Sequence, residues 1–178
     1  GISGTALEFD GYQTEVVLPL AQAPKIQGGD LTLEGWFALG AYPWNWVPLV
    51  QQGDNDGYFL GVASHGYPSL NANIGGVWQK LGVPSRPPYT DTNHLALFRW
   101  YHIAGTYSRT DGMMRLYIDG KEVAKKLAGS GGVQTVTADV RIGKAGIMRA
   151  PTEGTHDTLP SNFGLDGLVD EVRIYNVD

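Results

Sequence analysis

The feature that most constrains the fold of this chain is its repeated use of short apolar runs in which apolar and polar side chains often alternate. Gly, Pro, Asn and Asp separate these runs, and no segment shows the 3.6-residue period of a convincing amphipathic helix. Alternation with a period of two places successive side chains on opposite faces of a β-strand. The pattern therefore predicts strands over Thr5–Phe9, Glu15–Leu18, Leu31–Leu39, Val47–Gln52, Tyr58–Ala63, Ser69–Ile74, Val77–Val83, Phe98–Tyr107, Met113–Asp119, Lys121–Leu127, Asp139–Gly143 and Gly167–Tyr175.

Two tight turns join neighbouring runs. Asp119-Gly120 lies between two alternating segments, and Gly75-Gly76 does the same earlier in the chain. These dipeptides suit a type I′ hairpin, in which both central residues need a positive φ. About a dozen short strands without crossover helices predict an all-β fold, an antiparallel two-sheet sandwich of jelly-roll type.

Length and composition fit one globular domain, assigned to residues 1–178. The net charge of −5 argues against a nucleic-acid surface, which would need clustered Lys and Arg. No apolar run approaches the roughly 18 residues of a membrane span, so a membrane partner is not expected. The chain has no cysteine, so disulfides and thiolate metal sites are excluded, while secretion is not. Because it starts without Met or a signal peptide and ends directly after a predicted strand, we interpret it as a module of a larger secreted protein.

Six segments, in the right order along nearly the whole chain, resemble laminin-G-like domains of the concanavalin A-like lectin/glucanase superfamily. They are ALEFDGYQTEVVLP, LTLEGWF, RWYHIAGTYS, MRLYIDGKEVA, VRIGK and LDGLVDEVRIYN. The resemblance implies a jelly roll of two curved antiparallel sheets. It also implies a domain of the kind often attached to secreted bacterial polysaccharide-degrading enzymes. Many such domains bind carbohydrate, and many carry a structural calcium ion.

Asp170 interrupts the alternation of the last predicted strand. It shares the parity of Leu168, Val172 and Ile174, which should face the core, and no Lys or Arg of that parity neutralises it. An ionised carboxylate on a core face is costly unless it is paired, hydrogen-bonded or bound to a metal. One interpretation is a structural calcium shared with Asp10, because first and last strands of such sandwiches commonly pair, with Asp30 as a further ligand. The alternative is that Asp170 accepts backbone N–H groups from a neighbouring loop, without metal.

Trp44 and Trp46 lie in a proline-bounded stretch, Tyr42–Pro48, where a tryptophan is hard to bury fully. Exposed indole rings stack on the C–H faces of sugars, so this stretch is the first candidate carbohydrate site. The alternative is packing of the two rings against a neighbouring loop. Trp36 and Trp100 occupy strand positions that the resembling family uses for its core, and we expect them to pack there.

A second candidate site is the polar face of the strand Ser69–Ile74. Ser69, Asn71 and Asn73 alternate with apolar residues, and Trp78 lies opposite the two asparagines beyond the Gly-Gly turn. Amides beside an aromatic ring suit a polyol ligand; the alternative is a solvated sheet face. Tyr58 completes the candidate carbohydrate-binding residues. The acidic run GDNDG at residues 53–57 lacks the spacing of an EF-hand and is expected to form a turn that contributes polar contacts at most.

No catalytic motif accompanies these candidates. Glycosidases of this fold carry Glu-x-Asp-x-x-Glu along one strand, and this chain has no such run. We therefore expect no enzyme, but a non-catalytic module that tethers a polysaccharide-active enzyme, its neighbour in the same chain, to a polysaccharide or oligosaccharide. The expected location is secreted, either extracellular or at the bacterial cell surface or periplasm. The alternative function is an ancillary structural β-sandwich that packs against a catalytic domain and binds no ligand.

Overall fold

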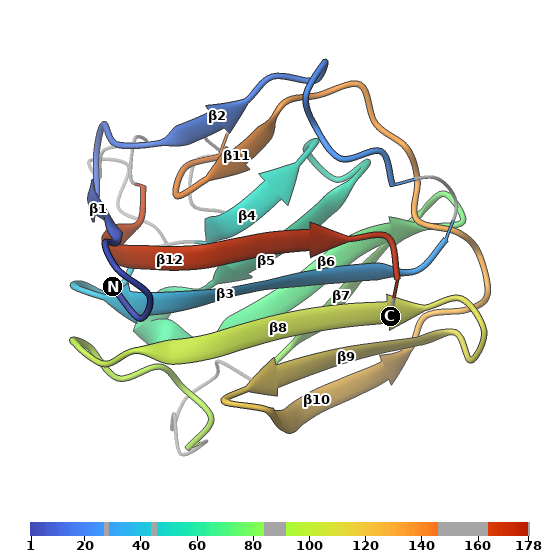
Figure 1. Cartoon of the computed structure of the whole chain (residues 1–178). Coiled ribbons are helices and arrows are strands. Elements are labelled where there is room, and N and C mark those ends of the chain that lie inside the picture. The colour runs from blue at the N-terminus through green and yellow to red at the C-terminus, as the bar shows by residue number, and fades with distance from the viewer. Residues whose placement is uncertain (27–28, 44–45, 84–91, 146–163, 178) are drawn as a thin grey trace, which may run out of the picture.

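The protein is an all-β sandwich of two six-stranded antiparallel sheets (Figure 1). The computed structural model describes residues 1–26, 29–43, 46–83, 92–145 and 164–177. Sheet A has the order β1 (Leu7–Asp10), β12 (Asp166–Tyr175), β3 (Leu31–Leu39), β8 (Tyr101–Ser108), β9 (Met113–Ile118) and β10 (Lys121–Leu127). Sheet B has the order β2 (Val16–Leu18), β11 (Val140–Ile142), β4 (Val47–Gln52), β5 (Tyr58–Val62), β6 (Pro68–Ile74) and β7 (Val77–Gly82).

Every predicted strand is confirmed, with differences only at the ends. The predicted ranges for β3, β4 and β10 match the observed bounds, whereas β8 begins at Tyr101, three residues after the predicted start. Outside the strands, the described part of the chain contains one short 3₁₀ helix, η1 (Ser64–Gly66). Within that part, no helix is long and apolar enough to cross a membrane.

Both predicted hairpin turns are confirmed by their backbone angles. Asp119 and Gly120 have φ values of 49° and 76°, and Gly75 and Gly76 have φ values of 59° and 86°. Both central residues therefore lie in the left-handed region, as a type I′ turn requires. The first turn joins β9 to β10 and the second joins β6 to β7, so each connects neighbours in its sheet.

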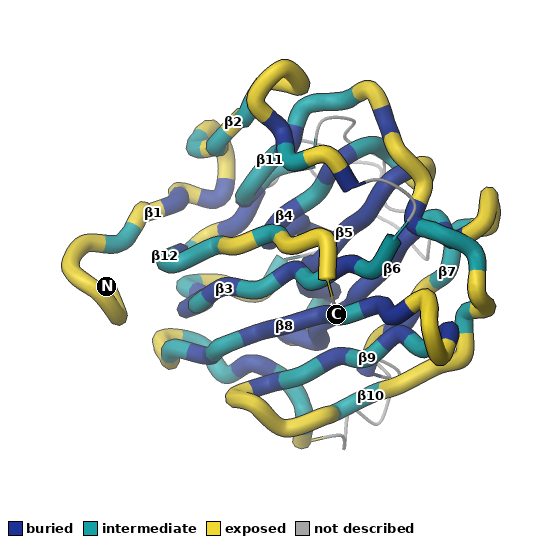
Figure 2. The backbone as a smooth tube through the Cα atoms, turned by 45° about the vertical axis from the view of Figure 1, so that its right-hand side comes forward, coloured by how far each residue is buried: buried dark blue, intermediate teal, exposed yellow. Residues whose placement is uncertain are grey.

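The core fills the space between the inner faces of the sheets. Leu33 and Ile103 of sheet A and Leu60 and Leu70 of sheet B are fully buried. Exposed positions gather at the turns and along the edge strand β10, whose sequence KEVAKKL presents charged side chains at this open edge (Figure 2). Alternating inward and outward side chains thus decide which residues remain available on the two outer faces.

A bulge in β12 corrects the predicted parity of this strand. Asp170 pairs with Trp36 and Arg173 pairs with Glu34, so two residues of β12 lie opposite the single residue Gly35. Before the bulge, Val169 faces the core and is buried, whereas Leu168 is 36% exposed. The expectation that Asp170 and Leu168 face the core is therefore wrong, because one extra residue reverses the alternation midway along the strand.

Trp36 also differs from its predicted role. It alternates with the buried Phe37 and lies on the outer face of sheet A, where its ring centroid is 5.3 Å from that of His102. The prediction that Trp36 packs in the core is wrong for the space between the sheets. Trp100, directly before β8, is partly exposed and is likewise outside the buried core.

Candidate functional site

The candidate site is the outer face of sheet B, where β6 and β7 carry polar side chains opposite a tryptophan. Asn73 of β6 is the direct cross-strand partner of Trp78 of β7, and Asn71 is the partner of Lys80. Directly paired residues have Cβ atoms about 4.5–5.5 Å apart, so the Asn73 amide and the Trp78 ring belong to one surface. The predicted proximity of these residues is confirmed. We call Asn73, Trp78 and the neighbouring Asn71 the amide–indole surface.

Asn73 has an amide group that is only half satisfied. Its Nδ2 donates a 3.2 Å hydrogen bond to the Asn55 carbonyl, which directs Oδ1 to the other side. Within the described part of the chain, this Oδ1 is buried and has no hydrogen-bond partner. A buried acceptor without a donor costs about 1–3 kcal/mol. A hydroxyl donor that reached Oδ1, from a bound water or a ligand, would remove that cost.

Asn71 is less accessible than the sequence suggested. Its side chain is 8% exposed, and the Ser69 hydroxyl lies 2.8 Å from its Oδ1 and 3.0 Å from the Leu81 carbonyl. The alternative of a solvated sheet face is therefore wrong for this half of β6. Asn71 remains beside Asn73 on the same face of the strand, but its contact area for a ligand is small.

The turn between β4 and β5 lies beside Asn73 in sheet B, and two side-chain amides donate hydrogen bonds to its backbone. Asn73 binds the Asn55 carbonyl, and Gln51 Nε2 donates a 2.6 Å hydrogen bond to the Gly53 carbonyl. Gln51 Oε1 is, like Asn73 Oδ1, buried without a partner in the described residues. Asn55 has a φ of 115°, a conformation rare for side-chain-bearing residues and typical of sites under local strain. The acidic run is thus a turn, as predicted, and the side chains of Asn73 and Gln51 hold it.

Sequence reasoning missed Gln51. Its neighbour Gln52 is also a glutamine, but Gln52 faces inward and donates to the Ala138 carbonyl at 2.9 Å. Only the pairing of Gln51 with Phe59 shows which of the two amides reaches the outer face. A run of two glutamines by itself contains no signal that separates them.

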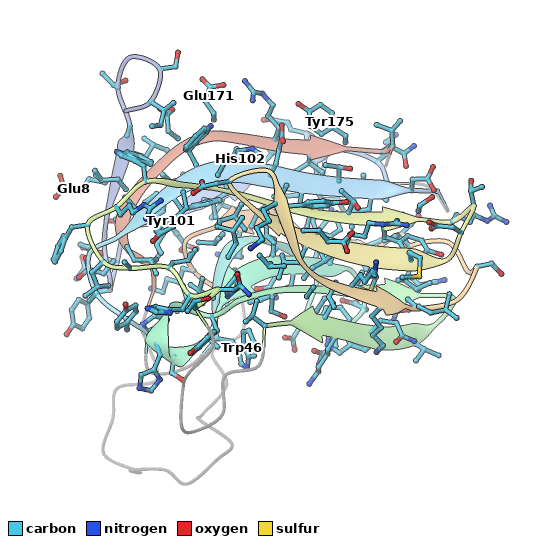
Figure 3. The ribbon with its side chains drawn as sticks, turned by 90° about the horizontal axis from the view of Figure 1, so that it is seen from below. Glu8, Trp46, Tyr101, His102, Glu171 and Tyr175 are labelled. Atoms are coloured by element: carbon cyan, nitrogen blue, oxygen red, sulfur yellow. The ribbon has the colours of Figure 1, made fainter. Side chains whose placement is uncertain are left out.

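Trp46 extends the aromatic surface along sheet B. The side chain is 46% exposed, and its ring meets the Phe59 ring edge-on, with centroids 6.2 Å apart and an interplanar angle of 79°. The expected exposure of Trp46 is confirmed. Figure 3 places it on the side of the sandwich opposite His102 and Tyr175. Trp44, predicted with it, lies outside the described residues.

Tyr58 does not belong to the site. It faces the core of sheet B, and its side chain is 1% exposed. Burial raises the pKa of its phenol, so the side chain is neutral at all physiological pH values. The prediction that Tyr58 contacts a sugar is wrong, because the alternation of β5 turns Phe59, not Tyr58, to the outer face.

The three candidate metal-binding carboxylates each have their own backbone partners. Asp10 Oδ1 accepts N–H groups from Tyr12, Gln13 and Thr14 at 2.8–3.0 Å, which holds the pKa of Asp10 far below its usual range. Asp170 Oδ2 accepts the N–H groups of Ile2 and Ser3 at 2.7 and 3.0 Å, and these bonds lower its pKa. The backbone-capping alternative for Asp170 is therefore what the structure shows. Asp30 Oδ1 accepts the Arg109 N–H at 2.6 Å.

These carboxylates do not fit one shared calcium ion. The first and last strands do pair, as expected, but Asp10 lies opposite Asp166, four residues from Asp170 and so about 13 Å along the strand. Asp30 precedes β3, and Leu39 at the other end of β3 pairs with Gly167, next to Asp166, about 30 Å from Asp30 along the strand. Calcium ligands lie within about 2.6 Å of the ion. Among the described residues, no group of three or more His, Cys, Asp or Glu side chains is arranged to hold a metal. Calcium remains a prediction from the sequence alone.

Comparison with protein families gives one match that covers nearly the whole chain. A family model described as the concanavalin A-like lectin/glucanases superfamily matches residues 10–178, nearly the full length. No curated protein sequence matches the chain significantly.

Solved structures share the same fold at low sequence identity. A putative carbohydrate-binding protein from Bacteroides ovatus has a TM-score of 0.62 and 17% identity over 96% of this chain and 44% of its own. The CBM40 domain of a Ruminococcus gnavus sialidase, bound to α2,3-sialyllactose, has a TM-score of 0.59 and 14% identity over 97% of this chain and 90% of its own. Domains LG4–5 of mouse laminin α1 have a TM-score of 0.62 and 18% identity over 97% and 41%, respectively. The chain thus spans less than half of the Bacteroides and laminin chains. At these identities the similarity establishes the fold.

Proposed function

Because the chain belongs to the concanavalin A-like lectin/glucanases superfamily, we propose that it is a non-catalytic carbohydrate-binding domain whose binding site is the amide–indole surface of sheet B. The observation that carries the proposal is the buried, unpartnered Asn73 Oδ1 beside Trp78. Sugars present hydroxyl donors next to C–H faces, and this combination matches an acceptor beside an indole ring. The exposed Trp46 extends the surface for further sugar rings of a chain.

The geometry favours binding over hydrolysis. Glycosidases need two carboxyl groups placed about 5–5.5 Å apart for retention or further apart for inversion. The cross-strand pairs of the amide–indole surface carry amides, an indole and the Lys80 ammonium. Such a surface recognises hydroxyls and stacks on rings, but these pairs include no two carboxyl groups of the kind that glycosidases use. Structural neighbours that are named as carbohydrate-binding also support the proposal.

A domain of this kind would act for a larger protein. We infer that it holds a polysaccharide-active enzyme, present in the same chain, against its glycan, and that the protein works outside the cell or at a bacterial surface. Bringing a tethered enzyme to its polymer raises the effective concentration of substrate without any new catalytic contact. The competing function is a structural sandwich in which the 46% exposed Trp46 packs against a neighbouring domain.

Affinity electrophoresis tests the proposal directly. The wild-type chain is run in gels containing a mixed-linkage β-glucan, an arabinoxylan or a galactomannan, and α2,3-sialyllactose is titrated by calorimetry. We expect at least one ligand to bind, and Asn73→Ala and Trp78→Ala each to weaken that binding at least tenfold. Trp36→Phe, which alters a tryptophan on the opposite sheet, is the matched control and should bind as the wild type does. Binding that survives both substitutions would refute the proposed site, whereas no binding to any of the four ligands would refute the proposed function and favour the structural sandwich.

A further inference from the structure

The outer face of sheet A contains a shallow groove that the proposed function does not use. It has a volume of about 680 Å³ and lies across β12, β3, β8 and β9, on the face opposite the amide–indole surface. Figure 3 shows this separation, since Tyr175 and His102 lie on one side of the sandwich and Trp46 on the other. A ligand in this groove would not contact the amide–indole surface.

Strand register explains the shape of the groove. Ala104 of β8 lies between Tyr117 of β9 and Glu34 of β3. Two residues further along its strand, Thr106 of β8 pairs with Thr32 of β3. These two threonines lie between Arg115 of β9 and Tyr175 of β12. Small side chains therefore form a floor along β3 and β8, and long side chains rise on both sides. The groove is thus a consequence of side-chain size at paired positions on two rows of the sheet.

One wall of the groove is held in place by a chain of polar contacts. The Tyr175 hydroxyl donates to Glu34 Oε1 at 3.2 Å, and Glu34 Oε2 lies 3.2 Å from His102 Nε2. His102 in turn packs its ring against Trp36. Side chains fixed in this way lose little further conformational entropy when a ligand binds. This wall is therefore preorganised.

The opposite wall combines a paired cation with a free phenol. Arg115 is ion-paired with Asp111 and lies 3.7 Å from the Glu122 carboxylate. Tyr117, in the same wall, and Thr106, in the floor, have hydroxyls without a hydrogen-bond partner in the described part of the chain. The groove thus offers hydrogen-bonding groups and aromatic rings, whereas its charged groups already have ion-pair partners.

Paired charges make the groove a poor site for a strongly charged ligand. Each arginine near the groove contacts two carboxylates, Arg115 with Asp111 and Glu122 and Arg173 with Glu34 and Glu171. The surroundings therefore carry a small excess of negative charge, which disfavours an anionic ligand. Two tyrosines on opposite sides of a floor rich in hydroxyls suit a neutral, polyhydroxylated ring, which can stack and exchange hydrogen bonds at once. We propose that this groove is a second carbohydrate-binding site, selective for neutral sugar chains.

Two sites on opposite faces have a consequence for function. If the amide–indole surface binds glycan, as proposed above, then one domain can contact two polysaccharide chains, or two segments of one chain, at the same time. Simultaneous binding raises the apparent affinity for polymers well above that for short oligosaccharides. The groove site itself rests on its own geometry and does not require the first site to exist.

Residue-resolved NMR distinguishes the two sites. The ¹⁵N-labelled wild-type chain is titrated with cellohexaose, xylohexaose and mannohexaose, which are neutral, and with α2,3-sialyllactose, which is anionic. We expect a neutral oligosaccharide to shift the amide signals of Thr106 and Tyr117. Tyr117→Ala should lower the affinity measured from these shifts at least tenfold, whereas Trp78→Ala should leave that affinity unchanged. Phe98→Ala, which removes an exposed aromatic side chain outside the groove, serves as the control.

The outcomes separate the groove from the proposed function. Shifts confined to β5, β6 and β7 would overturn the groove site and leave the proposed function standing. Shifts confined to β8 and β9, sensitive to Tyr117→Ala, would support the groove site and refute the amide–indole surface. A stronger groove response to α2,3-sialyllactose than to any neutral hexaose would overturn the proposed selectivity. No shift at either face with any of the four ligands would overturn both proposals.

Discussion

Asp170 and Trp36 are direct cross-strand partners on the outer face of sheet A, and the bulge of β12 begins at the next residue. This relationship explains the one irregular position in the last strand. Because the bulge adds one residue, the apolar side chains on its two sides can both face the core although they differ in parity. Val169 is buried before the bulge, and Val172 and Ile174 pack against the core after it. The carboxylate of Asp170 is left on the surface, where backbone N–H groups bind it.

Glu171 tests the conformation of the bulge. It has a φ of 52°, which costs a side-chain-bearing residue roughly 1 kcal/mol or more and a β-branched residue most. We expect Glu171→Val to lower the free energy of unfolding by about 1–3 kcal/mol. Glu171→Gly should change it by less than about 1 kcal/mol, because relief of strain offsets loss of the ion pair with Arg173. Urea denaturation measures both. Equal effects of the two substitutions would show that the backbone is not strained there.

Asp170 makes stability depend on pH. Hydrogen bonds from Ser3 and Ile2 lower its pKa in the folded state relative to the unfolded value of about 3.9. The stabilisation is therefore complete above the unfolded pKa and is lost as pH falls through the folded pKa. We expect Asp170→Asn, whose amide does not titrate, to be less stable than the wild type at pH 7. The difference should shrink between pH 4 and pH 2 in urea denaturation, and a difference independent of pH would contradict the assignment.

Tyr58 and Tyr107 form a matched pair of buried phenols. Tyr58 has no hydrogen-bond partner for its hydroxyl within the described residues, whereas the Tyr107 hydroxyl donates to the Gly129 carbonyl at 2.8 Å. Removing an unsatisfied hydroxyl is neutral or stabilising, while removing a bonded one leaves an acceptor unpaired. We expect Tyr58→Phe to raise the free energy of unfolding by up to about 1 kcal/mol and Tyr107→Phe to lower it by about 1 kcal/mol. Glycan binding by the Tyr58 variant should equal that of the wild type.

Chelation decides between the two interpretations of the carboxylates. Asp10 and Asp170 have separate backbone partners and lie about 13 Å apart along the strand pair, which does not fit a shared calcium ion. We therefore expect the melting temperature to be the same in EDTA as in about 2 mM calcium. A fall of several degrees in EDTA that Asp170→Ala abolishes would restore the interpretation reached from the sequence.

The sequence determined the framework of this protein because strand and turn signals are local. Apolar runs and alternation over a few residues predicted all twelve strands. The two dipeptide turns predicted the hairpins β6–β7 and β9–β10. The exposure of Trp46 followed in the same way from the prolines around it. Each of these features depends on residues that are neighbours in the chain.

Tertiary structure decided the details on which the candidate sites depend. Whether Gln51 or Gln52 faces outward, whether Asn71 is covered and where β12 reverses its alternation are set by partners far away in sequence. The groove on sheet A exists because small and large side chains from four strands fall into register. Strand pairing across the sandwich creates these arrangements, and no pattern within a single strand contains them.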